Sequence, residues 1–477
     1  MDRRFTPCAA RLGALVPLAV LATAWSASGM RSMASRTTDP ADVADFGAIG
    51  DGVADDTDAI QNAVNSKRGL VRFGAGVYRT TRPIVVDLDA AGPVCLDGQG
   101  VARLRMAGSG PAIRIVGTHF RSADPKGYEP RVWERQRMPI VERLAIEGAH
   151  ADSDGVEAVG TMQLTLSRLH IRNTRHAVRL VENNRNVLIA DCHLYENRGV
   201  GVFYDRVNLH QSNITGCHIS YNAEGGIVSR GGNVRNIHVT GCDLESNMSE
   251  TTAPTANILI DCRESVYGTA EVAITGCTIQ HNNPSPDSAN IRIFGGSLPM
   301  SDGQPVREGN IAITGNVLSD VQVNIHLVEC RGVAITGNTL WQGYRENLRF
   351  ENCSHLVIGS NNLDRNPRYA YGNTADANNA VVFRACDDST ISGLHVSNVR
   401  RTEAGVLFEN CRRMNIHGCT VLDCDGPGML LRGVNDSTVT ACLVHDARPG
   451  AAAPAIARVD CANLTIDGML EEPARND

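Results

Sequence analysis

Two stretches of the sequence decide the fold: NIHLVECRGVAITGNTL at residues 324–340 and NLRFENCSHLVIGSNNL at residues 347–363. They superpose without a gap at an offset of 23 residues. Further copies of the pattern begin at Ala380, Gly405, Gly428 and Ala455, and looser copies extend upstream to about Ala177. A period in the low twenties is typical of a solenoid, in which each repeat buries its apolar face against its neighbours.

Within one repeat the apolar residues alternate with polar ones, in the period of two that characterises a β-strand. Ile325 and Leu327 form the first such run, Val333 and Ile335 the second, and Leu340 lies in the third. None of the runs is long enough for a helix. The repeat therefore predicts an all-β chain in which coils of three short strands stack into three parallel sheets, a parallel β-helix.

Small and turn-forming residues recur where one strand should give way to the next. The corner ITG(N/C) is found at residues 214–217, 274–277, 313–316 and 335–338. Asparagine tolerates the left-handed backbone of tight turns, so stacked asparagines are expected to form a ladder there. Many of the 15 cysteines occupy equivalent positions of successive repeats, and we interpret them as small buried side chains that fill turns.

The amino-terminal residues resemble a secretory leader. Arg3 and Arg4 precede an apolar run at residues 12–24 that ends in Ala-Thr-Ala, and this run is too short to cross a bilayer. We expect residues 1–24 to be a signal peptide and residues 25–42 a linker, so that the protein is secreted, periplasmic or attached to the cell surface. The net charge of −7 becomes −9 without the leader, which argues against nucleic acid as a general partner.

Residues 43–79 open the expected domain with VADFGAIGDGVADDTDAIQNAVNSKRGLVRFGAGVYR. Asp55, Asp56 and Thr57 are typical of a helix start, and Ile60 and Val64 recur at helical spacing. A solenoid needs its open end covered, so we expect a short amphipathic helix that caps the first coil.

This segment resembles the amino-terminal signature of the pectate lyase superfamily, in particular its rhamnogalacturonase/epimerase-like and glycoside-hydrolase-28-related branch. The resemblance is specific over about 40 residues and architectural over most of the chain. The resemblance implies that the parallel β-helix is right-handed. From the repeat and its interruption we expect the β-helix domain at residues 43–477, with the cap and first strands at 43–117, a long loop at 118–139 and regular coils at 140–470. Proteins of this superfamily mostly bind or cleave polysaccharides, many of them rich in uronate.

The alternation predicts which side chains face outward on the first strand of each coil, where this superfamily usually binds its substrate. Ile325 and Leu327 point inward, so His326 and Val328 point outward. One outward column is predicted to read Phe203, Val228, Leu259, Arg292, His326, Arg349, Val382, Leu407. The column beside it is predicted to read Asp205, Arg230, Asp261, Phe294, Val328, Glu351, Arg384, Glu409.

Cationic and titratable groups on neighbouring rungs suit an anionic sugar. The candidate catalytic residues are His326, Arg349, Arg292, Glu351 and Asp261. The candidate substrate-binding residues are Arg230, Arg384, Trp341, Tyr344, Tyr369 and Tyr371. Asp205 and Asp261 are candidate oxygen ligands for Ca²⁺, although the sequence contains no dedicated calcium loop. The alternative for these columns is a solvated sheet face held by ion pairs.

We expect an enzyme that cleaves a uronate-containing polysaccharide, either by β-elimination or by hydrolysis. The sequence has only two lysines, Lys67 and Lys126, so a lysine base is disfavoured and His326 or an arginine would have to abstract the proton. Hydrolysis would need two carboxylates across one glycosidic bond, and the pair Asp387–Asp388 lies in a predicted turn. Because no catalytic motif is complete, a non-catalytic glycan-binding or surface-structural protein is the alternative. The sequence leaves the oligomeric state open.

Overall fold

In the computed structural model of the protein, the described residues are 39–124, 126–252, 255–300, 303–304, 306–369 and 374–468. The chain divides into the units Met1–Asp39 and Pro40–Asp477, and the fold described here is that of the second unit. The predicted signal peptide and most of the predicted linker lie outside the described residues. The first strand, β1 (Ala41–Asp42), lies at the end of the expected linker, where it pairs with β3 (Leu70–Arg72).

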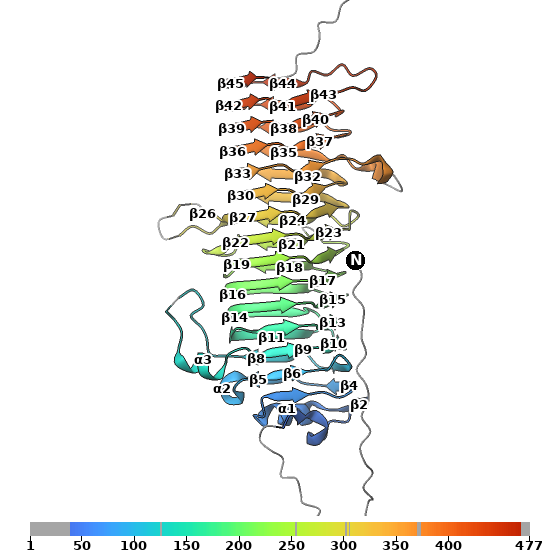
Figure 1. Ribbon diagram of the computed structural model, residues 1–477, viewed down its shortest axis with the longest axis vertical. Coiled ribbons are helices and arrows are strands. Elements are labelled where there is room, and N and C mark those ends of the chain that lie inside the picture. Colours follow the sequence, from blue (N-terminus) through green and yellow to red (C-terminus); the bar gives the residue numbers. More distant parts are fainter. Residues whose placement is uncertain are drawn as a thin grey trace, which may run out of the picture. The chain divides into compact units, whose positions relative to one another are not determined.

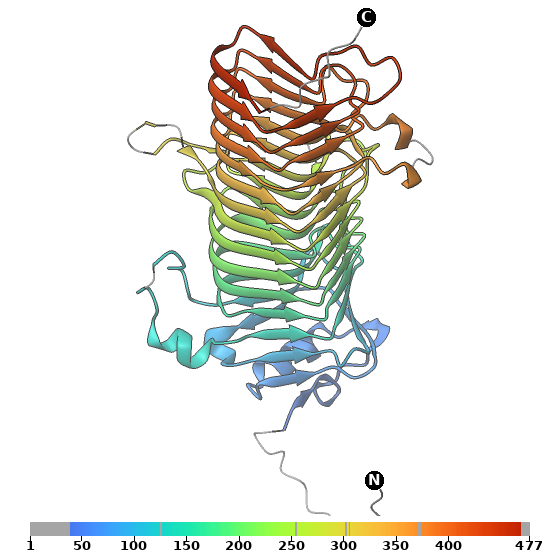
Figure 2. The same ribbon diagram turned by 45° about the horizontal axis from the view of Figure 1, so that its top comes forward.

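The repeat at residues 324–340 folds as one coil of three strands, β29 (Val321–Val328), β30 (Arg331–Thr336) and β31 (Thr339–Leu340). The next repeat forms β32 (Gly343–Glu351), β33 (Ser354–Ile358) and β34 (Asn362–Leu363). Strands of successive coils pair in parallel, and Ile325 pairs with Leu348. The coils stack as Figures 1 and 2 show, so the predicted parallel β-helix is confirmed.

Three columns of strands run along the stack, and we call them sheets 1, 2 and 3. Sheets 1 and 2 are joined where the long strands β14 and β16 run through both. Sheet 1 contains β5 (Ile84–Asp87), β8 (Gly110–Val116), β11 (Ser153–Met162), β14 (Val178–Ala190), β16 (Val200–Thr215), β18 (Gly225–Arg230), β21 (Thr255–Asp261), β24 (Ser288–Phe294), β29, β32, β35 (Ala380–Arg384), β38 (Val406–Glu409), β41 (Met429–Arg432) and β44 (Ile456–Val459).

Sheet 2 contains β1, β3, β6 (Cys95–Asp97), β9 (Ile140–Glu142), β12 (Thr165–Ser167), the later parts of β14 and β16, β19 (Asn233–Thr240), β22 (Gly268–Thr275), β27 (Gly309–Thr314), β30, β33, β36 (Asp387–Ser392), β39 (Arg412–His417), β42 (Asn435–Thr440) and β45 (Ala462–Asp467).

Sheet 3 contains β2 (Asp51–Asp55), β4 (Gly76–Thr80), β7 (Ala102–Met106), β10 (Ala145–Gly148), β13 (His170–Arg172), β15 (His193–Tyr195), β17 (His218–Ser220), β20 (Asp243–Glu245), β23 (Thr278–Gln280), β28 (Val317–Ser319), β31, β34, β37 (His395–Ser397), β40 (Thr420–Leu422) and β43 (Leu443–His445). A small antiparallel hairpin, β25 (Gly296–Ser297) with β26 (Val306–Arg307), stands outside the three sheets.

Asparagines and cysteines line the corners between strands, as predicted. Asn338 Nδ2 donates to Asn361 Oδ1 at 2.9 Å on the next coil, in the ladder expected at the ITGN corner. A second ladder, which sequence reasoning missed, lies where sheet 3 gives way to sheet 1. It links the amides of Asn197, Asn222, Asn247, Asn257, Asn290, Asn324 and Asn347 through side-chain contacts of 2.7–2.9 Å.

The amino-terminal end of the stack carries the predicted cap. Helix α1 (Thr57–Asn65) buries Ile60, Ala63 and Val64 against the core, so its apolar face covers the first coils (Figure 1). Two further helices are short, α2 (Leu88–Ala91) and α3 (Pro130–Arg135). Three 3₁₀ turns complete the helical elements of the described residues, η1 (Val43–Phe46), η2 (Pro367–Tyr369) and η3 (Thr374–Asp376).

Insertions leave the stack at the corners of the coils. The segment predicted as a long loop at residues 118–139 contains α3 and stands out beside the lower coils in Figure 1. It is anchored to the coils because the guanidinium of Arg185 lies 4.7 Å from the ring of Tyr128, and because Ser122 donates to the carbonyl of Asn184 at 2.6 Å. The hairpin β25–β26 projects farther up the stack, and η2 and η3 lie in another insertion.

Candidate functional site

The two outward columns predicted on sheet 1 exist in the predicted register. Arg292 pairs with His326 and His326 with Arg349, so these residues lie on successive rungs about 4.8 Å apart. In the adjacent column Val328 pairs with Glu351. The same pairing continues through the other coils, from Phe203 and Asp205 to Leu407 and Glu409.

Five side chains of this face form one polar network, which we call the arginine–histidine cluster: Asp287, Arg292, His326, Arg349 and Glu351. His326 Nε2 lies 2.9 Å from Glu351 Oε2, and Arg349 Nη2 donates to Glu351 Oε1 at 2.8 Å. Arg292 Nε donates to His326 Nδ1 at 3.1 Å. Because Nδ1 accepts this bond, the proton of the neutral ring resides on Nε2, which donates to Glu351.

Arg292 corrects one expectation, because it does not stand on an open sheet face. Its side chain is fully buried, at 0% exposure. The turn that precedes β24 folds over it: the carbonyl of Asp287 accepts from Arg292 Nη1 at 2.6 Å, and the Asp287 carboxylate lies 3.0 Å from Nη2. Arg292 therefore holds His326 through a hydrogen bond from the neighbouring strand, and it cannot itself contact a polymer on the surface.

The charges of the cluster are strongly perturbed. The hydrogen bond with His326 and the ion pair with Arg349 lower the pKa of Glu351 to about 2, although burial acts in the opposite direction. Burial lowers the pKa of the Arg292 guanidinium to about 10. Burial also acts to lower the pKa of Arg349, but the hydrogen bond to Glu351 outweighs it and the pKa lies above its usual value. Glu351 is thus held as a carboxylate.

Arg349 is partly accessible to a ligand. Its side chain is 24% exposed, and Nη2 is already bonded to Glu351. Its Nε is buried and has no hydrogen-bond acceptor among the described residues. A buried N–H without an acceptor costs about 1–3 kcal/mol.

Asp261 is not brought to this cluster. Phe294 and Val328 separate it from Glu351 along their shared column. Burial acts to raise the pKa of Asp261, but its ion pair with Arg263, at 2.7 Å, leaves the pKa below its usual value. Asp261 is a paired structural carboxylate in this geometry.

The structure does not assemble the calcium site expected at Asp205 and Asp261. Arg230 lies between them in the register, and Arg179 pairs with Asp205 at 2.5 Å. Among the described residues no group of three or more His, Cys, Asp or Glu side chains is placed to hold a metal ion. Both carboxylates therefore neutralise arginines.

The predicted substrate-binding residues are scattered. Arg384 lies on the rung after Glu351 and pairs with Glu409 at 3.0 Å. Trp341 lines a cavity of about 200 Å³ beside the insertion that carries η2 and η3. Tyr344 is 9% exposed, which corrects the expectation that its ring faces a sugar. Tyr371 and the side chain of Tyr369 lie outside the described residues.

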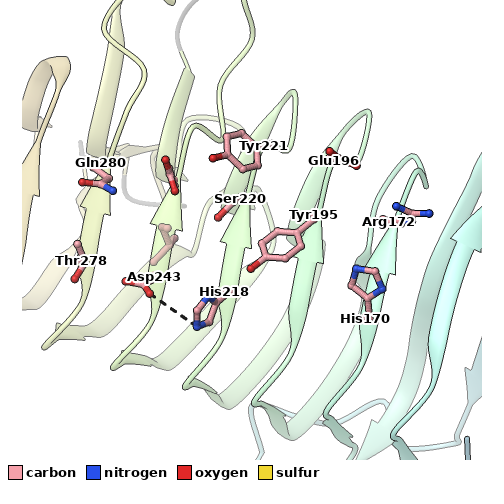
Figure 3. A pocket seen from close by; sticks show the side chains of 12 residues that line it. His170, Arg172, Tyr195, Glu196, His218, Ser220, Tyr221, Asp243, Thr278 and Gln280 are labelled. Atoms are coloured by element: carbon pink, nitrogen blue, oxygen red, sulfur yellow. Dashed lines mark ion pairs between the residues drawn. The ribbon is translucent and has the colours of Figure 1, made fainter. Parts of the chain in front are cut away.

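A larger hollow lies on sheet 3, and the sequence did not predict it. The cavity measures about 490 Å³ and is lined by side chains of β13, β15, β17, β20 and β23 (Figure 3). The stacked polar residues His193, His218 and Asp243 were visible in the sequence, but they are equally typical of a surface ladder. The informative signal was the tyrosines at residues 195 and 221, one strand apart.

Three family models match separate parts of the chain. They are described as "Rhamnogalacturonase A/epimerase, pectate lyase-like" at residues 41–105, "Right handed beta helix region" at 134–257 and "Periplasmic copper-binding protein (NosD)" at 301–443. The chain is a right-handed parallel β-helix protein with a pectate lyase-like amino-terminal segment. The expected resemblance is confirmed. Among curated proteins there is no match to this β-helix chain.

Several solved structures are similar to this β-helix, and one of them has a TM-score above 0.5. Gene product 12 of bacteriophage phi29, in its pre-mature form, is 12% identical, with a TM-score of 0.58 over 91% of this chain and 57% of that one. Tailspike protein 3 of bacteriophage CBA120 is 14% identical, with a TM-score of 0.47 over 90% and 57%. The mannuronan C-5 epimerase A-module of Azotobacter vinelandii is 16% identical, with a TM-score of 0.41 over 91% and 98%. The β-helix chain thus spans little more than half the length of either phage protein.

The copper named in the third family description does not fit the residues of this β-helix. The described cysteines between residues 301 and 443 are buried in the core, and no metal-holding group of side chains is present in the part of the chain that the structure describes. The described helices include none that is long and apolar enough to span a bilayer.

Proposed function

We propose that the protein binds an acidic, uronate-containing polysaccharide across sheet 1 and cleaves it by β-elimination at the arginine–histidine cluster. The observation that carries this proposal is Arg349, whose partly exposed side chain ends in a guanidinium beside the His326–Glu351 pair. A planar guanidinium is well matched to a carboxylate, because it can donate two parallel hydrogen bonds.

The charged side chains around Arg349 are close to balanced. Arg292 and Arg345 share the Asp287 carboxylate, and Arg345 also lies 3.4 Å from Glu346. Arg349 and His326 share Glu351. A uronate carboxylate would therefore be held here by direct hydrogen bonds from Arg349 and not by a net positive charge.

The protonation states favour elimination over hydrolysis. Hydrolysis by a pair of carboxyl groups needs one of them protonated as a general acid, and Glu351, with a pKa of about 2, stays ionised. Elimination needs a base that removes the proton α to the uronate carboxylate and a cation that stabilises the resulting charge. In this proposal Arg349 is the cation and His326 is the base, whose Nδ1 must give up the hydrogen bond from Arg292 before it takes the substrate proton. The C–O bond β to the carboxylate breaks, the leaving oxygen takes a proton from water, and the new chain end is unsaturated.

We also propose that the protein acts outside the cytoplasm, with residues 1–24 as the signal peptide and residues 43–477 as the functional domain. The support is the leader-like composition of residues 1–24 together with a match to a family described as periplasmic. Such a location would place the protein where polysaccharides of cell walls and capsules occur.

The test is a depolymerisation screen of the purified protein on pectate, rhamnogalacturonan, alginate and neutral glycans, with and without Ca²⁺. Ultraviolet absorbance reports unsaturated ends, and reducing sugar reports all chain ends. Both signals should rise together on an acidic substrate, and His326→Ala and Arg349→Ala should lower the rate by at least about 100-fold. Arg412→Ala, which changes an exposed arginine on sheet 2, should leave the rate unchanged. Reducing sugar without absorbance would contradict elimination.

A second candidate function is glycan binding without cleavage. The engagement of both ring nitrogens of His326 favours it, because a base needs a free lone pair to accept the substrate proton. Retained binding of an acidic polysaccharide with no new chain ends on any substrate would establish this function instead.

A further inference from the structure

The hollow on sheet 3 has a floor made of two outward columns in register. The side chains between the columns, such as Leu194 and Ile219, are buried in the core. The first column consists of His170, His193, His218, Asp243 and Thr278, and the second of Arg172, Tyr195, Ser220, Glu245 and Gln280. This face is distinct from sheet 1, where the arginine–histidine cluster lies.

A small residue makes the face concave. Ser220 lies between Tyr195 and Glu245 in its column and is buried at their base. Glu196 and Tyr221 follow their strands at turn positions with left-handed backbone, φ 52° and 60°, and their side chains line the same cavity of about 490 Å³. Figure 3 shows Tyr195, Ser220 and Tyr221 on the same side of neighbouring strands.

The two tyrosines present ring surface and hydroxyl groups together. Tyr195 is held in place because its hydroxyl lies 3.4 Å from His193 Nδ1 and its ring packs edge-on to His170, with centroids 6.3 Å apart. Tyr221 is 52% exposed. Aromatic side chains with an apolar body and a polar end are suited to the C–H faces of sugar rings, and the surrounding Ser220 and Gln280 can bond sugar hydroxyls.

The electrostatics of the hollow exclude an acidic sugar. Three carboxylates line it, those of Glu196, Asp243 and Glu245. Its single arginine, Arg172, lies 3.6 Å from Glu147. Burial and nearby positive charges lower the pKa of His170, so this ring is neutral at pH 7. A uronate carboxylate would meet net negative charge here, whereas sugar hydroxyls would find both donors and acceptors.

We infer that the hollow lined by Tyr195, Ser220 and Tyr221 is a second carbohydrate-binding site, which takes a non-acidic glycan segment. It does not rest on the proposed elimination, because none of its residues belongs to the arginine–histidine cluster. The protein would then hold neutral sugars on sheet 3 and acidic sugars on sheet 1.

The test is calorimetric titration of the purified protein with a cellulose-type hexasaccharide, a chitosan-type hexasaccharide and an oligogalacturonate. We expect binding of a non-acidic probe that weakens by at least about tenfold in Tyr195→Ala and in Tyr221→Ala, which correspond to a loss of one stacking ring each. Ser220→Phe, which fills the hollow, should weaken it similarly. Tyr267→Ala is the matched control, because Tyr267 is also 52% exposed but lies between β21 and β22, away from sheet 3.

The inference is overturned if neither non-acidic probe binds, or if such a probe binds equally well to the wild type and to both tyrosine variants. It is also overturned if the tyrosine variants weaken the oligogalacturonate and not the other probes. Tyr221 is exposed, so Tyr221→Ala retains the fold. This variant therefore tests the inference even if Ser220→Phe misfolds.

Discussion

The carboxylate of Glu351 accepts hydrogen bonds from two side chains of its own face, one on the neighbouring strand and one on the same strand. His326 Nε2 lies 2.9 Å from Oε2 and Arg349 Nη2 lies 2.8 Å from Oε1. These bonds stabilise the ionised form in the folded protein, which is why the pKa of Glu351 falls to about 2. Removing the charge would leave a single carbonyl oxygen as the acceptor for two donors.

We therefore predict that Glu351→Gln lowers the free energy of unfolding at pH 7 by about 2 kcal/mol. A carboxylate with a depressed pKa stabilises the fold above its unfolded pKa, near 4.5, and this contribution disappears as the pH falls towards 2. The difference between wild type and variant should accordingly shrink between pH 4.5 and pH 2. Denaturant unfolding across this range is the measurement, with the exposed Glu224→Gln as control. A difference that is constant with pH would contradict the assignment.

Alternation in the sequence predicted which residues face outward on sheet 1, and the pairing of Arg292 with His326 and of His326 with Arg349 follows that prediction. It could not predict the burial of Arg292. Strand periodicity tells which side of a sheet a side chain occupies, but the cover over Arg292 comes from a turn at Asp287 whose path has no periodic signal. Tyr344 lies on a strand whose outward side was predicted, and its 9% exposure was likewise not predicted by the alternation.

At the scale of elements, the corners between strands determine how the coils stack. Two columns of cysteine follow the corners, and neighbouring coils contact each other there: the Cys330 backbone N–H donates to Cys353 Sγ, with 3.4 Å between nitrogen and sulfur. The 14 cysteines of the described chain are free thiols, and all are buried except Cys95 and Cys461, which are partly buried. They fill turns as small apolar side chains.

We predict that these thiols stay unreactive in the folded protein, because their burial keeps a reagent in solution from reaching them. Burial raises the pKa of Cys95 to about 11 and that of Cys424 to about 11. Labelling with a thiol reagent at pH 8 should modify at most Cys95 and Cys461 within the mature chain, and all thiols once the protein is unfolded. Mass spectrometry of the labelled peptides provides the readout. Rapid labelling of Cys353 or Cys386 in the native protein would contradict a packed corner.

The sequence predicted α1 from its acidic start and its apolar spacing, and the helix lies at Thr57–Asn65 with Ile60 and Val64 buried. It did not predict α3 or the second asparagine ladder. Helix α3 is a six-residue turn that depends on contacts of the insertion with the coils, and contacts of that kind leave no local pattern. The ladder was hidden because its asparagines follow one another at irregular spacing, from 10 to 34 residues.

At the scale of the whole solenoid, stacking converts positions far apart in sequence into neighbours. Arg292 and His326 are 34 residues apart, yet their side chains share a hydrogen bond. The three sheets provide three faces, and two of them carry polar groups that suit different ligands. Sheet 1 carries arginines, which suit an acidic ligand, and sheet 3 carries tyrosines with carboxylates, which suit a non-acidic one. The repeat predicted this arrangement of faces, whereas the hollow on sheet 3 depends on the size of single residues such as Ser220.

The central claim is that an acidic glycan is bound on sheet 1 through Arg349, and its most direct test is a titration of oligogalacturonate into wild type, Arg349→Leu and Arg412→Leu. Both substitutions remove one partly exposed arginine, so they change the net charge equally. We predict at least about tenfold weaker binding for Arg349→Leu and wild-type affinity for Arg412→Leu. Equal affinity of wild type and Arg349→Leu would contradict the claim. Equal weakening by both substitutions would also contradict it, because the attraction would then be a general effect of charge.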